Sequence, residues 1–92
     1  MPLVYLQDKF EDAIAVYDSI LKEHPESPRA MIGRARALEE LAVEQKSDYI
    51  LKQSAKEYDR FMRESKDAAA ELVVKAGLQL VHIQEFLGKV DV

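Results

Sequence analysis

Histidine and acidic side chains are the residues of this 92-residue chain that could hold a metal ion or transfer a proton. His24, Glu26 and the distant His82 have the His-x-acid…His form of non-haem iron sites. Such sites need rigid strands that aim three ligands at one point, whereas His24-Pro25-Glu26 has the composition of a turn. His82 and Glu85, one helical turn apart, provide only two ligands and are interpreted as part of a salt-linked helix face. We expect no metal site and no cofactor.

Nucleophilic and phosphate-binding motifs are absent from the sequence. It contains no cysteine, no glycine-rich phosphate loop and no serine–histidine–acid set on an orienting scaffold. The serines are interpreted as helix caps or helix-surface residues: Ser19, Ser27, Ser47, Ser54 and Ser65. The tyrosines are interpreted as packing residues rather than a ligand cage: Tyr5, Tyr17, Tyr49 and Tyr58. We therefore expect that this chain is not itself an enzyme and has no catalytic residues.

The composition is that of a folded chain with a charged surface. Apolar residues make up 48% and charged residues 33%, and the net charge is −4. Because its cations are scattered among acidic residues, we expect no nucleic-acid interface. The longest apolar stretch, residues 68–74, already contains Glu71, so we expect no insertion into a membrane. No signal-peptide pattern precedes the first expected helix, and any targeting signal is expected outside this sequence.

Helical periodicity fits almost the whole chain and predicts an all-α fold with four helices. The first full helix is expected to begin at Asp8, with Glu11 completing a capping box, and to stop before Pro25. The second is expected to begin at Ser27-Pro28, a hydroxyl cap followed by proline at the first helical position, and to end near Lys46.

The other two helices are expected from similar signals. Ser47 is expected to cap the third helix and Ser65 or Asp67 the fourth, which Gly88 ends. Ahead of the first helix, residues 3–6 form a short apolar stub. The apolar positions expected to form the core are Phe10, Ala13, Ile14, Tyr17, Ile20 and Leu21; Ala30, Met31, Ala35, Ala37, Leu38, Leu41 and Ala42; Ile50, Leu51, Ala55, Tyr58, Phe61 and Met62; Val73, Ala76, Leu80, Ile83 and Leu87.

The spacing of Ala13, Tyr17 and Pro25 resembles the tetratricopeptide repeat (TPR). That repeat has a small residue, an aromatic residue four positions later and a proline eight positions beyond it. The small residue admits a neighbouring helix, the aromatic residue fills the groove between helices, and the proline breaks the chain. The resemblance implies a TPR-like α-solenoid fragment, in which antiparallel helix hairpins stack side by side.

The chain is accordingly divided as one TPR-like domain over residues 1–92. Residues 1–25 are expected to be the end of one repeat, 26–66 an elongated repeat, and 67–92 the first helix of a further repeat. The elongation is inferred from Ser54 and Tyr58, which follow Ala13 and Tyr17 seven residues later than a 34-residue period allows. It is expected to project residues 44–51 beyond the other helices.

A narrower resemblance is to the TPR region of aspartyl/asparaginyl β-hydroxylases. Four stretches carry it: Phe10-Glu-Asp-Ala-Ile, His24-Pro-Glu-Ser-Pro-Arg-Ala30, Lys46-Ser-Asp with Tyr58 downstream, and Gln84-Glu-Phe-Leu-Gly88. The resemblance implies a non-catalytic segment in the endoplasmic-reticulum lumen. The parent would be a type II membrane enzyme, a peptidyl-aspartate β-dioxygenase whose separate domain uses Fe(II) and 2-oxoglutarate on EGF-like domains. The repeats would support that domain and its substrate channel.

Two other functions remain open from the residues. One is a free-standing TPR adaptor that binds peptides in the cytoplasm, and the other is a structural spacer or self-association unit. Self-association is expected through the stub at residues 3–6, unless it folds back, or through an apolar outer side of the last helix with Leu72 and Phe86.

A binding surface is expected on the concave side of the array, which the first helix of each repeat lines. It would be a mixed-charge strip with a few apolar residues, suited to an acidic or polar segment of a protein partner. The alternative interpretation is an ordinary solvated helix face. The residues expected to line it are Arg29, Ile32, Arg36, Glu39, Lys75, Leu78, His82 and Glu85.

Overall fold

The computed structural model describes the backbone of residues 2–64 and 70–90 and the side chains of residues 9–64 and 70–89. Within these residues the chain is all-helical, without a β-strand, as the periodicity predicts. The four helices are α1 (Pro2–Glu23), α2 (Pro28–Gln45), α3 (Asp48–Glu64) and α4 (Ala70–Val90).

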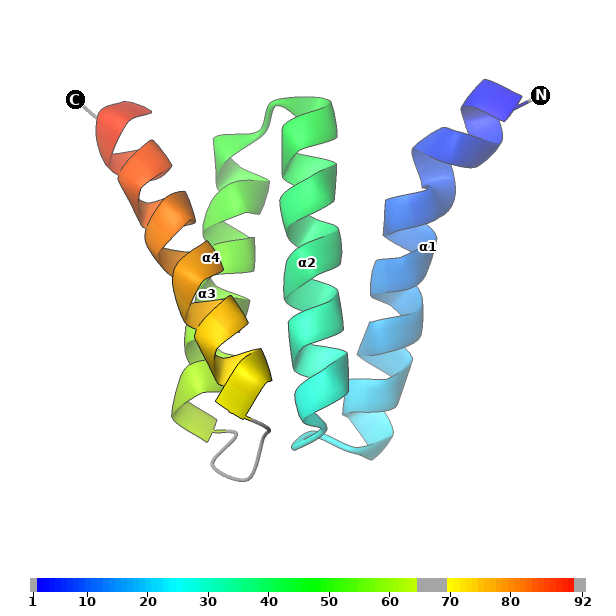
Figure 1. Ribbon diagram of the computed structural model, residues 1–92. Helices are drawn as coiled ribbons and strands as arrows, with labels where there is room; N and C mark the ends of the chain where they lie inside the picture. The colour runs from blue at the N-terminus through cyan, green and yellow to red at the C-terminus, as the bar shows by residue number, and fades with distance from the viewer. Residues whose placement is uncertain (1, 65–69, 91–92) are drawn as a thin grey trace.

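The four helices form an open row (Figure 1). Each helix packs extensively against its neighbour in sequence, α1 on α2, α2 on α3 and α3 on α4. The outer helices α1 and α4 lie on opposite sides of the molecule, and α3 lies behind α2 and α4 in this view. Such a row leaves one side of α2 free to face the space between α1 and α4.

Local capping signals fix both ends of α2, as predicted. Ser27 Oγ accepts a hydrogen bond from the Ala30 amide at 3.3 Å, and proline occupies the first helical position. At the other end Lys46 adopts the left-handed conformation (φ 53°, ψ 45°), and the Ser47 amide donates to the Ala42 carbonyl at 2.9 Å. This is the hydrogen-bond pattern of a Schellman motif. Ser47 Oγ then caps α3 by accepting from the Ile50 amide at 3.2 Å, so the turn between α2 and α3 is short.

The core lies where α2, α3 and α4 meet. Its buried members are Met31, Ala35, Ala42, Leu51, Tyr58, Phe61, Ala76 and Ile83. The predicted stripes of α2 and α4 are confirmed, and Val73, Leu80 and Leu87 pack against this core from α4. Ile20 and Met62 are exceptions, because 37% and 40% of their surfaces are exposed.

Polar contacts of Arg34 and Ser54 help to fix α2 against α1 and α3. Ser54 Oγ, fully buried, donates a hydrogen bond of 2.7 Å to the Ala35 carbonyl and so joins α3 to α2. Arg34 Nε donates to Asp18 Oδ1 of α1 at 2.6 Å. The same guanidinium lies 3.6 Å from Glu57 Oε1 of α3. Arg34 therefore bridges α1 and α3 across α2.

The predicted start of α1 and the predicted end of α4 are wrong, whereas α1 stops before Pro25 as predicted. Helix α1 runs continuously from Pro2, so Asp8 lies inside it instead of capping it, and residues 3–6 continue the helix instead of folding back. Gly88 likewise lies inside α4, which continues to Val90. A helical glycine costs only about 1 kcal/mol relative to alanine and does not by itself end a helix. The predicted caps Ser65 and Asp67 lie outside the described residues.

Residues 44–51 were expected to project beyond the other helices, and this prediction is wrong for Ile50 and Leu51. Leu51 is buried in the core and Ile50 packs against it. Ile50 and Leu51 therefore belong to the packed part of α3. In Figure 1 the turn between α2 and α3 lies level with the ends of α1 and α4.

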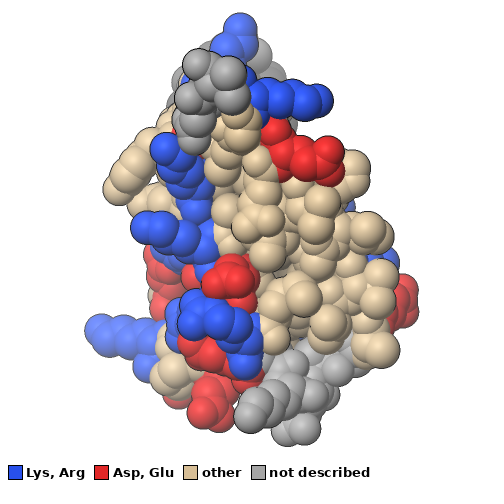
Figure 2. Space-filling view, turned by 90° about the vertical axis from the view of Figure 1, so that its left-hand side faces the viewer, with Lys and Arg blue, Asp and Glu red and all other residues tan. Residues whose placement is uncertain are grey.

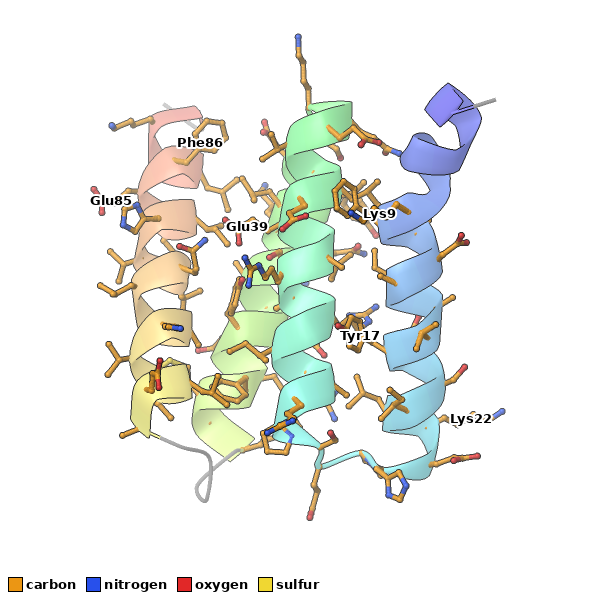
Figure 3. The ribbon with its side chains drawn as sticks, turned by 45° about the vertical axis from the view of Figure 1, so that its right-hand side comes forward. Lys9, Tyr17, Lys22, Glu39, Glu85 and Phe86 are labelled. Atoms are coloured by element: carbon orange, nitrogen blue, oxygen red, sulfur yellow. The ribbon has the colours of Figure 1, made fainter. Side chains whose placement is uncertain are left out.

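Two helical glycines should respond differently to alanine. At Gly77 an added Cβ would lie 3.5 Å from the Met62 sulfur, an ordinary contact, so Gly77→Ala should raise the free energy of unfolding by about 0.5–1 kcal/mol. At Gly33 the Cβ would overlap the Tyr17 ring, which lies between α1 and α2 (Figure 3). Gly33→Ala should therefore give no gain or a loss.

Chemical denaturation followed by circular dichroism measures both changes. Tyr17→Ala combined with Gly33→Ala provides the control, because removing the ring should restore the helix-forming advantage of alanine at position 33. Equal stabilisation by the two single substitutions would contradict the close contact between Tyr17 and Gly33.

Candidate functional site

A groove lies along α2, between α1 and α4. It has a volume of about 900 Å³, and Tyr58 of α3 forms part of its wall. Its apolar lining comes from all four helices: Phe10 and Tyr17, Ile32 and Val43, Tyr58, and Leu72 and Leu78. Figure 3 shows Tyr17 pointing into the space between α1 and α2 and Glu39 pointing from α2 toward α4. The groove therefore follows from the row of helices.

Six of the eight residues expected on the concave surface line this groove. They are Arg29, Ile32, Arg36 and Glu39 of α2 and Lys75 and Leu78 of α4. His82 and Glu85 do not line it and are exposed elsewhere on α4. Figure 3 shows Glu85 pointing away from the other helices. Beyond Leu78, the residues spaced one turn apart, His82 and Glu85, lie on the outer side of α4. The side of α4 that faces the groove carries Leu72, Lys75 and Gln79.

Glu39 is the centre of a hydrogen-bond network in the groove wall. Tyr58 Oη donates to Glu39 Oε1 at 3.0 Å, and Gln79 Nε2 donates to Glu39 Oε2 at 2.6 Å. One half-buried carboxylate thus joins α2 to both α3 and α4. The sequence pattern predicts only a packing role for Tyr58 and does not point to Gln79. The only signal for Gln79 is its position one turn after Lys75.

The network changes the acidity of Tyr58. Burial raises the pKa of its hydroxyl well above the ordinary tyrosine range, and the negative charge of Glu39 and the hydrogen bond to it act in the same direction. Tyr58 is therefore a neutral donor at physiological pH, and it holds Glu39 in place.

The cations of the groove lie at its rim and are weakly engaged. Arg36 lies 3.6 Å from Glu40, and Lys75 lies 3.3 Å from Glu71, with all four side chains largely exposed. Arg29 is exposed and forms no ion pair with any side chain that the structure describes. Exposed pairs of this kind contribute about 0–1 kcal/mol, so these cations can exchange their partners for a ligand.

The two histidines considered for metal binding lie in different parts of the structure. His24 is exposed in the turn between α1 and α2, and His82 is exposed on α4. Among the described residues, no three His, Asp or Glu side chains cluster so that they could hold an ion. Within residues 2–64 and 70–90, every helix falls short of the uninterrupted apolar length that a bilayer crossing needs.

Comparison with known proteins finds distant relatives of this chain. The chain is 30% identical over 80 residues to the aspartyl/asparaginyl beta-hydroxylase of Mus musculus, an alignment that covers 87% of this chain and 11% of that protein. Identity to the Homo sapiens protein of the same name is 28% over 80 residues, covering 87% of this chain and 10% of that protein. The chain thus spans about a tenth of the length of these relatives.

The comparison supports a distant relation to these hydroxylases, in agreement with the resemblance seen in the sequence. No protein-family model matches the chain. No solved structure matches it.

The raised pKa of Tyr58 predicts a specific loss of stability at alkaline pH. Above about pH 10 the unfolded chain loses the Tyr58 proton while the folded chain keeps it, so the folded state binds more protons and stability falls as the pH rises. This contribution is fully present below pH 10. In Tyr58→Phe the fall in the free energy of unfolding between pH 9 and pH 11 should therefore be smaller than in the wild type.

Denaturant unfolding at several pH values, with tyrosinate absorbance at 295 nm, provides the measurement. The wild type should show a tyrosine component that ionises only on unfolding and disappears in Tyr58→Phe. Tyr49→Phe, at a side chain that is 71% exposed, is the control and should leave that component unchanged. Loss of the component in Tyr49→Phe instead would contradict the assignment.

Proposed function

We propose that this chain is a non-catalytic TPR-like segment of an aspartyl/asparaginyl β-hydroxylase-like protein, and that it binds a segment of a protein partner in its groove. The observation that carries the proposal is the groove itself. It brings together three cations, the carboxylates of Glu39 and Glu40, of which Glu39 is held by hydrogen bonds, and apolar side chains along the free side of α2. The distant similarity to two hydroxylases supports the choice of parent.

The packing of the helices supports a TPR-like arrangement. In this proposal α1 ends one repeat, α2 and α3 form an elongated repeat, and α4 begins another, with divisions at residues 1–25, 26–66 and 67–92. Tyr17 packs where the repeat requires an aromatic residue, against Gly33 of the next helix. Contacts between sequential helices, with α1 and α4 apart, are those of a stack open at both ends.

The chemistry of the groove favours an extended segment with acidic and apolar side chains. Arg29, Arg36 and Lys75 can pair with carboxylates at the rim. Glu39 accepts one hydrogen bond on each oxygen and retains lone pairs for backbone amides of the ligand. Ile32 and Leu78 offer apolar contacts between these groups.

The proposed partner is the protein substrate of a hydroxylase, an EGF-like domain, which exposes aspartate or asparagine. In this proposal, iron and 2-oxoglutarate chemistry belongs to a separate catalytic domain that the segment supports, and the compartment is the endoplasmic-reticulum lumen. The role of this chain is to hold the substrate, without cofactor or catalytic residue of its own.

Removal of two rim cations should weaken this binding. Fluorescence anisotropy of a dye-labelled EGF-like domain, titrated with the 92-residue chain, measures the affinity. The double substitution Arg29→Ala with Arg36→Ala should raise Kd about tenfold, because each charged contact at a partly desolvated rim is worth about 0.5–1 kcal/mol.

A matched control changes the net charge equally away from the groove. Lys56→Ala with Arg63→Ala removes two exposed cations of α3 that do not line it. This control should leave Kd within about twofold of the wild type, because dissolved salt screens charges that lie far from the groove. If both double variants bind like the wild type, the groove is not the binding surface.

A further inference from the structure

The groove has two chemically different ends. Among the residues that line it, all three cations lie on the same side of Glu39, because Arg29 and Arg36 precede it on α2. Lys75 lies one turn before Gln79, which is hydrogen-bonded to Glu39, and α4 runs parallel to α2 (Figure 1). We call Arg29, Arg36 and Lys75 the cationic end of the groove.

The opposite end is apolar. Val43 lines the groove there and is 72% exposed. Phe10 of α1 lies close to the same level, because α1 is antiparallel to α2 and Tyr17 packs against Gly33. Seven residues before Tyr17, Phe10 therefore lies near the level of Glu40. We call Phe10 and Val43 the apolar end.

Two carboxylates separate the ends. Glu39 and Glu40 line the groove and lie between Arg36 and Val43 on α2. They repel an acidic ligand side chain that is placed beside the apolar end, whereas the cationic end attracts it. The groove therefore discriminates between ligands of the same composition by the order of their acidic and apolar residues.

The spacing of residues on α2 indicates the backbone conformation of the ligand. Arg29, Arg36 and Val43 are seven residues apart, nearly two turns, so they share one side of α2 at intervals of about 10.5 Å. In polyproline II conformation every third side chain points the same way, at intervals of about 9.3 Å. Side chains on one face of a β-strand recur about every 6.6 Å, which does not match. The amides of a polyproline II segment have no internal hydrogen bonds and are free to donate to Glu39.

A helical ligand fits the groove less well. A helix about 10 Å across and 21 Å long, the span from Arg29 to Val43, occupies about 1,600 Å³. The groove has a volume of about 900 Å³. The amides in the middle of such a helix are also hydrogen-bonded internally, so Glu39 would gain no backbone donor from it.

From this arrangement we infer that the groove binds a polyproline II segment with acidic first and fourth residues and a large apolar seventh residue, counted from its cationic end. The inference rests on the proposed function, because it specifies the segment that the groove holds. The two acidic residues pair with Arg29 and Arg36, with Lys75 beside them. The apolar residue packs on Phe10 and Val43.

Two dye-labelled peptides of equal composition test the order of residues. The ordered peptide is Glu-Pro-Ala-Glu-Ala-Pro-Phe, and the exchanged peptide is Glu-Pro-Ala-Phe-Ala-Pro-Glu. The exchanged peptide reads the same in both directions, so it cannot regain the order by turning round in the groove. Fluorescence anisotropy during titration with the 92-residue chain should show that the ordered peptide binds at least about fivefold more tightly.

A substitution at the apolar end should reverse this preference. Val43→Lys should weaken binding of the ordered peptide about fivefold and strengthen binding of the exchanged peptide, because its last glutamate then meets a cation. Val81→Lys is the matched control, since Val81 is 51% exposed on α4 and does not line the groove. Charged side chains gather mainly along one edge of the α4 side of the molecule (Figure 2). This control should leave the preference unchanged, and circular dichroism checks that each variant is folded.

Failure of the inference can be distinguished from failure of the proposed function. Equal binding of the two peptides, or no binding of either, would overturn the inference. So would a preference that Val43→Lys does not reverse. The proposed function would stand in each case if the EGF-like domain still bound less tightly to Arg29→Ala with Arg36→Ala. It would fall as well if that double substitution had no effect.

Discussion

Packing of α2 between α1 and α3 is the constraint on which the rest of the structure depends. Ala35 and Ala42 are buried where α3 approaches, and their small size lets the Ser54 hydroxyl reach the Ala35 carbonyl at 2.7 Å. On the α1 side, Gly33 leaves room for the Tyr17 ring. Because small residues occur on both sides of α2, two helices can approach it closely, and the chain extends as a row instead of closing into a ring.

The groove is a consequence of that row. The side of α2 that packs against neither neighbour faces the space between α1 and α4, and it carries Arg29, Arg36 and Glu39. Helices α2 and α4 are not joined by broad packing, so the hydrogen bond between Gln79 and Glu39 at 2.6 Å fixes their separation. For the partner segment proposed above, a carboxylate held in this way by Tyr58 and Gln79 would be a preformed acceptor, which would limit the entropy lost on binding.

The sequence predicts those features of the fold that depend on residues close together in the chain. Ser27, Pro28 and Ser47 cap helices through contacts within four residues, so the ends of α2 and the start of α3 were predictable. Asp8 has the same local form, yet α1 continues through it, because a capping residue acts only where the preceding chain leaves the helix. The α4 side of the core shows a similar limit: Leu72, expected on the outer side, packs against the core.

The groove was predictable from α2 and less so from α4. Pro28 fixes the start of α2 and therefore which of its residues share a side, so all four expected residues of that helix line the groove. Which side of α4 faces the groove depends on how α4 packs against α3. The residues expected from α4 therefore included His82 and Glu85, which lie on its outer side, and did not include Gln79. Tyr58 could not be found by spacing, because it reaches the groove from α3 through the gap between α2 and α4.

The open row is tested most directly by the distance between its two outer helices. The chain contains no cysteine, so spin labels can be attached at Val16→Cys in α1 and Gln84→Cys in α4, with unlabelled chain added to suppress contacts between copies. Double electron–electron resonance should give a single distance between the two labels. That distance should be several times the roughly 10 Å that separates the axes of two packed helices. A short distance, with α1 lying directly against α4 as in a closed bundle, would contradict the account.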